Sequence, residues 1–216
     1  MLNIEHCALN PFAANTFLVW DPASGEAAMI DPAASNERER EEMRERVEEY
    51  GAKIKYVINT HGHIDHIVGN RFAIETFGGT LLFPSGDKPL LDGAPDQAEM
   101  YGFEYQPSPE PDADLNEGTD ILLGDERLRV VHTPGHSPGE HSLLYEKGAA
   151  AFVGDVIFKG AIGRYDLWGG DETTLIETIK TKILSLPDDT ILYAGHGEKT
   201  TAGDERRSNP FLASFL

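Results

Sequence analysis

One short stretch of polar side chains constrains this chain more than any other part of its sequence. Three histidines and an aspartate stand within six positions, in the order His61-x-His63-x-Asp65-His66. The stretch follows an apolar run at 54–58 that is typical of a buried strand, and it precedes an apolar helical stretch at 67–77. A strand that leads through a polar loop into a helix is a frequent frame for a functional site. We therefore expect a metal-binding loop at the end of this strand.

The spacing within this loop suits two neighbouring cations. Side chains two positions apart in an extended segment point to the same side, so His61 and His63 are expected to face one point. Asp65 and His66 stand where the helix begins and can face a second point. Three further candidates each follow an apolar run and a glycine, and strand ends can meet at one edge of a sheet. These candidates are His136, Asp155 and His196.

We accordingly expect two divalent metal ions on seven side chains. The first ion is assigned to His61, His63 and His136, the second to Asp65, His66 and His196, and Asp155 bridges both. Cys7 is the only cysteine, which excludes an intramolecular disulfide and a thiolate cluster. Zinc takes about four nitrogen or oxygen ligands, and a hydrolytic site keeps one position for water. Zinc is the expected metal, with iron or manganese as alternatives because histidine and carboxylate accept all three.

The net charge argues against nucleic-acid and membrane partners. The chain has 37 acidic and 18 basic residues, and its formal charge of −19 repels phosphate backbones and anionic lipid headgroups. No apolar stretch approaches the roughly 18 to 20 residues of a membrane span. Residues 1–20 lack the basic start and apolar run of a signal peptide. We expect a cytoplasmic protein that acts on a small molecule, and the sequence leaves open whether it is a monomer or a homo-oligomer.

Local patterns predict strands and helices within a single domain, residues 1–216. An amphipathic helix is expected at 36–50, opened by Asn36 and Glu39 as a capping box, and a second helix at 173–186. Residues 84–118, rich in proline, glycine and acid, are expected to form a long surface connection around a short helix near 96–101. Alternating or apolar runs predict strands at 2–9, 16–20, 27–30, 54–58, 121–123, 128–131, 142–145, 150–153 and 190–194.

These motifs resemble those of a known family. Residues 61–66 match the His-x-His-x-Asp-His signature of the metallo-beta-lactamase superfamily without a gap. Other stretches are similar to the small glyoxalase II-like hydrolases of that superfamily, namely 11–17, 30–32, 133–139, 154–155, 163–166, 195–197 and 209–212. The resemblance implies an α/β fold, a four-layer αββα sandwich of two mixed β-sheets flanked by helices, with the metals at one edge.

The resemblance also implies a reaction. The ligand pattern of glyoxalase II carries over, residue by residue, onto all seven candidates: His61, His63, Asp65, His66, His136, Asp155 and His196. The implied enzyme is a dinuclear metallohydrolase in which metal-bound hydroxide cleaves a thioester, either S-lactoylglutathione or a related small acyl thioester. Asp65 and Asp155 are the carboxylates expected to act in catalysis. True beta-lactamases of the superfamily lack the bridging aspartate or the full ligand set, so antibiotic hydrolysis is not expected.

The side chains expected to hold an anionic substrate tail are Lys159, Arg164 and Tyr165. Arg164 falls where glyoxalase II uses a basic residue for the glycyl carboxylate of glutathione. Two tyrosines of that family are missing, since Asp166 replaces one and none follows His196. The chain ends about where the sandwich should end, so we expect no helical C-terminal domain of the kind that supplies much of the glutathione contact in full-length glyoxalase II. Asp31 is the expected acceptor for a ring N–H of a metal-binding histidine.

A different reaction class stays open. The Gly-Arg-x-Asp stretch at 163–166 also resembles persulfide dioxygenases, which keep one iron on two histidines and an aspartate. The dioxygenase predicts oxygen uptake and sulfite, whereas the hydrolase predicts thiol release without oxygen. The closing stretches at 195–197 and 200–203 resemble the hydrolase more. A purely structural metal is a third alternative, although seven candidates exceed the four ligands that normally close a structural zinc site.

Overall fold

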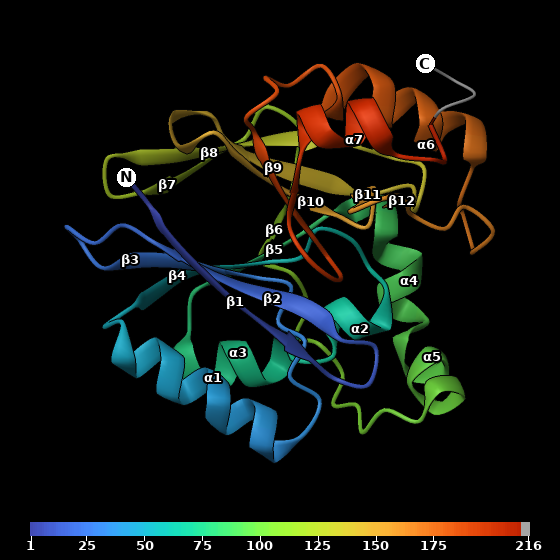
Figure 1. Ribbon diagram of the computed structural model, residues 1–216. Coiled ribbons are helices and arrows are strands. Elements are labelled where there is room, and N and C mark those ends of the chain that lie inside the picture. Colours follow the sequence, from blue (N-terminus) through green and yellow to red (C-terminus); the bar gives the residue numbers. More distant parts are fainter. Residues whose placement is uncertain (213–216) are drawn as a thin grey trace.

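The chain forms two sheets that face each other, with helices on both outer sides (Figure 1). The computed structural model describes residues 1–212, and residues 213–216, the end of the predicted domain, lie outside the described residues. Each sheet has six strands and contains both parallel and antiparallel pairs. The predicted four-layer αββα sandwich is therefore confirmed.

The first sheet carries its strands in sequence order. β1 (Asn3–Leu9), β2 (Ala14–Trp20) and β3 (Glu26–Ile30) pair in antiparallel fashion, and β4 (Lys53–Ile58), β5 (Thr80–Phe83) and β6 (Ala113–Asp114) continue from β3 in parallel. Helices α1 (Glu37–Glu49) and α3 (Asn70–Phe77) cover its outer face, as Figure 1 shows. The N-terminal half of the chain thus makes one sheet and one helical layer.

The second sheet has the strand order β14-β13-β10-β9-β8-β7. Its strands are β7 (Asp120–Leu123), β8 (Glu126–His132), β9 (His141–Tyr145), β10 (Ala150–Gly154), β13 (Ile191–Ala194) and β14 (Thr200–Thr201). The outer layer consists of α6 (Glu172–Thr178), the π-helical turn Ile179–Ile183 and α7 (Ala202–Ser208). A separate small hairpin is formed by β11 (Ile157–Phe158) and β12 (Ala161–Ile162).

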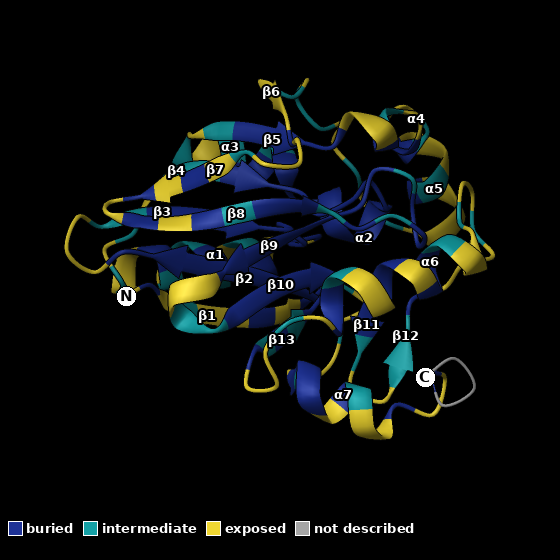
Figure 2. Ribbon diagram, turned by 90° about the horizontal axis from the view of Figure 1, so that it is seen from above, coloured by how far each residue is buried: buried dark blue, intermediate teal, exposed yellow. Residues whose placement is uncertain are grey.

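Apolar side chains from both sheets make the central core. Phe17 of the first sheet contacts Phe152 of the second, with ring centroids 5.1 Å apart. On the outside, Met43 and Val47 form the i, i+4 stripe of α1 and pack against the first sheet. Figure 2 shows this pattern as buried strands beneath helices whose outer faces are exposed. Among residues 1–212, no helix combines the length and apolarity needed to cross a membrane.

The predicted capping box at α1 forms only in part. Asn36 accepts a hydrogen bond from the backbone N–H of Glu39 at 3.1 Å, as predicted. The Glu39 carboxylate does not return to Asn36 and instead accepts from the N–H and the hydroxyl of Ser35, at 2.8 and 3.0 Å. Ser35 offers this buried carboxylate two donors, whereas a capping box would use only the backbone N–H of Asn36.

The segment at 84–118 differs most from its prediction. The short helix predicted near 96–101 is confirmed as α5 (Ala94–Tyr101). The expected surface connection also contains the 3-10 turn Ser85–Asp87, α4 (Lys88–Asp92) and β6. Leu91 and Ala98 are buried against α2 (Ile64–Ile67) in a cluster of their own. Because each helix spans at most eight residues, its apolar positions are too few to establish a period.

The helix predicted at 67–77 is likewise divided, into α2 and α3, with Gly69 between them. The N–H of Gly69 donates to the carbonyl of Pro32 at 2.9 Å. A Cβ atom at Gly69 would lie 2.6 Å from that same oxygen, so glycine is required for this close approach. The division separates the short helix that carries Asp65 and His66 from the longer one that covers the sheet.

Candidate metal centre

Four loops from the two sheets meet at one edge of the sandwich. β8 and β10 both pair antiparallel with β9, and β13 pairs parallel with β10, so β8, β10 and β13 run in the same direction. Their carboxyl ends therefore lie at one edge, followed by His136, Asp155 and His196 respectively. The loop after β4 brings the 61–66 cluster to the same edge from the other sheet, where His63 Nδ1 lies 2.8 Å from His136 Nε2.

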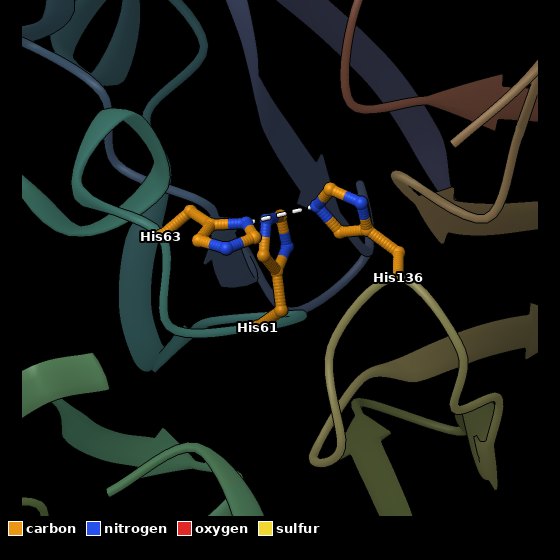
Figure 3. A group of neighbouring side chains, drawn as sticks. All are labelled: His61, His63 and His136. Atoms are coloured by element: carbon orange, nitrogen blue, oxygen red, sulfur yellow. Dashed lines mark hydrogen bonds between the residues drawn. The ribbon is translucent and has the colours of Figure 1, made fainter. Parts of the chain in front are cut away.

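His61, His63 and His136 form the first group of candidate ligands, and Figure 3 shows their rings turned toward one another. One ring nitrogen from each lies within 4.8 Å of the others. All three side chains are buried, and His61 Nε2 has no hydrogen-bond partner among the described residues. Three buried imidazoles with nitrogens facing a common point are a donor set that zinc favours.

Asp65, His66 and His196 form the second group, again with ligand atoms within 4.8 Å. Asp155 stands between the two groups. Its Oδ1 lies 3.6 Å from His66 Nε2, and its Oδ2 lies 3.7 Å from His136 Nε2 and 3.5 Å from His196 Nε2. Asp155 Oδ1 is buried without a hydrogen-bond partner in the described part of the chain. The carboxylate is thus placed where it could contact a cation in either group.

The imidazoles of the first group are held in the neutral form. Burial lowers the pKa of His63 to about 3 and that of His136 to about 4, and neighbouring imidazoles add to the effect at His63. Burial likewise lowers the pKa of His61 well below its usual value. A histidine must be neutral at one nitrogen to bind a metal. The first group is therefore ready for a cation throughout the neutral pH range.

The second group has the opposite electrostatic character. Burial opposes protonation of His66, but Asp65, Asp155 and Asp31 outweigh it and raise its pKa to about 10. Burial would raise the pKa of Asp65, yet His66 and His196 together lower it well below the usual range. A concentration of negative charge that attracts protons also attracts a divalent cation, which must then displace those protons.

Backbone carbonyls and Asp31 determine which nitrogen of each ring faces the centre. His136 Nδ1 lies 2.7 Å from the Arg164 carbonyl, and His196 Nδ1 lies 3.0 Å from the Phe12 carbonyl. Because a carbonyl only accepts, each Nδ1 donates and each Nε2 is left free for a cation. The prediction for Asp31 is confirmed, since its Oδ2 accepts from His66 Nδ1 at 3.1 Å.

Asp31 also lies within reach of His61 and His66 as a possible third group. Its oxygens are already occupied, because they accept from the N–H and the hydroxyl of Thr60, both at 2.7 Å, as well as from His66. These bonds make Asp31 a support for the histidine loop rather than a further ligand.

The comparisons with known proteins agree with this geometry. The family model for the metallo-beta-lactamase superfamily matches residues 9–196. The chain belongs to the metallo-beta-lactamase superfamily. Hydroxyacylglutathione hydrolase GloC of Haemophilus influenzae is 40% identical over 216 residues, covering 99% of both chains. The mitochondrial persulfide dioxygenase ETHE1 of Mus musculus is 30% identical over 201 residues, covering 91% of this chain and 70% of the relative.

Two solved structures have closely similar folds. The BLEG-1 B3 metallo-beta-lactamase has a TM-score of 0.89 and 33% identity, covering 98% of this chain and 100% of the other. TTHA1623 in a di-iron-bound form has a TM-score of 0.86 and 35% identity, covering 96% and 100%. Members of this superfamily bind divalent metals, and the metal in the TTHA1623 structure is iron.

The three predicted substrate contacts lie at the surface. The two basic side chains among them, Lys159 and Arg164, are each paired with an acidic residue. Lys159 forms an ion pair with Glu198. The Arg164 guanidinium makes a bidentate contact with Asp166, in which its Nε and Nη2 donate to the two carboxylate oxygens at 2.9 and 3.0 Å. Tyr165 is 39% exposed. Arg164 contacts the candidate centre through its backbone carbonyl, which accepts a hydrogen bond from His136 Nδ1. Its guanidinium is directed to Asp166.

Sequence reasoning missed two buried acids beneath the centre, Asp87 and Glu140. Glu140 Oε1 accepts from the N–H of Asp155 at 2.6 Å, and its side chain is fully buried. Burial, reinforced by the charge of Asp155, raises the pKa of Glu140 well above its usual value. Neither acid stands at a recognisable spacing from a ligand, so only the folded chain reveals their positions.

Proposed function

We propose that this chain is a dinuclear metallohydrolase that cleaves a small acyl thioester, S-lactoylglutathione or a related compound. The observation that carries the proposal is the position of Asp155 between two separate groups of candidate ligands. The hydroxyacylglutathione hydrolase at 40% identity supports the reaction class and the substrate. A shared carboxylate is the arrangement expected of a two-metal hydrolytic site.

The residues present fit two cations. Of the four buried side-chain atoms without a hydrogen-bond partner in the described residues, His61 Nε2 and Asp155 Oδ1 lie at this centre and are uncompensated without a cation. The first ion would be held by His61, His63 and His136, the second by Asp65, His66 and His196, and both by Asp155. When bound, such cations supply Lewis acidity and lower the pKa of water toward neutrality.

The chain itself supplies orientation and substrate binding. The Arg164 and Phe12 carbonyls hold the rings of His136 and His196, and Glu140 holds the backbone of Asp155. Lys159, Arg164 and Tyr165 would bind the anionic tail of the substrate. The acidic partners of Lys159 and Arg164 are exposed, so a substrate carboxylate can replace them at small cost, since surface ion pairs contribute little to stability.

A second candidate function is an iron-dependent persulfide dioxygenase. The mouse persulfide dioxygenase, 30% identical over most of this chain, favours it. One iron on two histidines and an aspartate would leave several of the candidate ligands without a role. The two functions therefore differ in metal content, in oxygen dependence and in product.

The decisive assay follows thiol release from S-lactoylglutathione, with and without oxygen, by zinc-loaded and iron-loaded protein. We expect thiol release at the same rate in both atmospheres. His63→Ala removes a proposed metal ligand and should lower turnover while the protein stays folded. The loss should exceed the 10–100-fold decrease in activity that is typical when a residue hydrogen-bonded to a metal ligand is removed. His6→Ala is the matched control, because His6 is exposed on β1.

Two further substrates separate the alternatives. Oxygen consumption and sulfite from a glutathione persulfide, without thioester cleavage, would contradict the proposal and favour the dioxygenase. A cephalosporin is included because the B3 metallo-beta-lactamase is 33% identical, and we expect no turnover of it. Cleavage of the cephalosporin alone would also contradict the thioester proposal.

A further inference from the structure

A single buried carboxylate joins the two loops that carry the first group of histidines. Asp87 Oδ2 accepts from the N–H of Gly62 at 2.9 Å and from the hydroxyl of Ser137 at 2.6 Å. Its Oδ1 accepts from the N–H of Gly139 at 2.6 Å. Gly62 stands between His61 and His63, and Ser137 follows His136 directly. The Asp87 side chain is completely buried and belongs to the turn before α4, outside both loops.

Glycines allow this close approach from both sides. A Cβ atom at Gly62 would lie 2.9 Å from Asp87 Cβ, and one at Gly139 would lie 2.5 Å from the Asp87 nitrogen. A Cβ at Gly86 would lie 2.8 Å from Gly139 Cα. The two loops and the turn are therefore packed backbone against backbone around the carboxylate, which leaves little room for either loop to shift.

We propose that Asp87 is a positioning residue that sets the separation of His63 and His136. It contacts none of the candidate metal ligands through their side chains and acts through the loop backbones on both sides of it. The two imidazole nitrogens that it aligns lie 2.8 Å apart and come from different sheets. The inference rests on the metal centre of the proposed function and is independent of which thioester is cleaved.

Three converging donors explain why this position needs a carboxylate. Both carboxylate oxygens accept, whereas an asparagine amide presents one acceptor and one donor group. In Asp87→Asn, the amide NH₂ would face the N–H of Gly62 if turned one way and that of Gly139 if turned the other. In the first case the 61–66 loop loses its hydrogen bond to residue 87, and in the second the 133–139 loop keeps only the hydrogen bond from Ser137.

The test measures the metal affinity of the folded protein, by competition with a chelator, for wild type, Asp87→Asn and the control Asp114→Asn. Asp114 is an exposed acid of the neighbouring strand β6 and accepts from the N–H and the hydroxyl of Ser85, at 2.7 and 2.9 Å. We expect Asp87→Asn to bind zinc about 10–100-fold more weakly at one site and to change the absorption spectrum of the cobalt-loaded protein. The control should keep wild-type affinity and spectrum.

The outcomes separate a positioning role from a structural one. Wild-type affinity and spectrum in Asp87→Asn, with only a lower unfolding temperature, would overturn the inference. If Asp87→Asn does not fold, Ser137→Ala removes one of the three hydrogen bonds and should show a smaller loss of affinity in the same direction; wild-type affinity there would overturn it equally. A wild-type protein that binds no zinc or cobalt would instead contradict the proposed function, and this inference with it.

Discussion

Glu126 joins the start of the chain to the second sheet through three partners. Its carboxylate accepts from the Tyr145 hydroxyl at 2.8 Å and pairs with Lys147 and with the N-terminal amine, the latter at 3.0 Å. The side chain is only 6% exposed. The hydrogen bond from Lys147, then that from Tyr145, lowers the pKa of Glu126 from its ordinary 4.5 to about 2.

This shift predicts a pH-dependent contribution to stability. Because the folded-state pKa lies below the unfolded-state value, the contribution of Glu126 is fully present above about pH 4.5 and is lost as the pH falls toward 2. Glu126→Gln should therefore lower the unfolding temperature at pH 7, and the difference from wild type should shrink between pH 4.5 and 2.

Thermal unfolding across this pH range provides the check. The matched control is Glu146→Gln, because Glu146 is 57% exposed and pairs with Arg129 at the surface. The control should stay close to wild type at every pH. A constant difference between Glu126→Gln and wild type down to pH 2 would contradict the prediction.

The loop that carries His136 packs against α6, a helix more distant in the sequence. The Gly135 carbonyl accepts from the N–H of Asp171, the N-cap of α6, at 2.9 Å. Gly135 has φ +133°, and a Cβ there would lie 2.3 Å from the Leu175 backbone in α6. The start of α6 is therefore in direct backbone contact with Gly135, the residue before the candidate ligand His136.

Gly135→Ala should consequently displace His136 and lower the metal-to-protein ratio of the loaded enzyme. The control is Gly102→Ala. Gly102 has φ +74° and open space where a Cβ atom would lie, so alanine there adds backbone strain of about 1–2 kcal/mol without a steric clash. Metal analysis of both variants gives the measurement. A Gly135→Ala protein with wild-type metal content would show that α6 does not constrain the site.

Elements with a clear period could be predicted, and most of the elements missed by the prediction have none. Met43 and Val47 mark α1 by their helical spacing, and the cluster after β4 lies at a strand end as expected. Beyond β5, the short helix expected near 96–101 is present as α5, but the turn Ser85–Asp87 and α4 have no such pattern, and this turn holds Asp87. A residue that acts through three contacts distant in sequence leaves no local signal.

The whole molecule explains how the seven side chains proposed from the sequence come to lie near one another. Each follows a strand, and the shared direction of β8, β10 and β13 brings three of these strand ends to one edge. What could not be predicted is how the rings are oriented. Every residue has a carbonyl, so nothing in the sequence distinguishes those of Phe12 and Arg164, which only the packing of the two sheets places beside His196 and His136.

The candidate centre draws its ligands from both sheets. His61, His63, Asp65 and His66 belong to the first, and His136, Asp155 and His196 belong to the second. The N–H of Asn15 in β2 also donates to the Gly195 carbonyl at 2.7 Å, which ties the sheets together beside His196. Relative movement of the sheets would therefore alter both groups of ligands at once.

Anomalous diffraction from crystals of the metal-loaded protein tests the two-cation centre most directly. We expect two peaks about 3.5–4 Å apart, one among the nitrogens of His61, His63 and His136 and one among the ligand atoms of Asp65, His66 and His196, with Asp155 between them. A single peak, or peaks that lie away from these side chains, would contradict it.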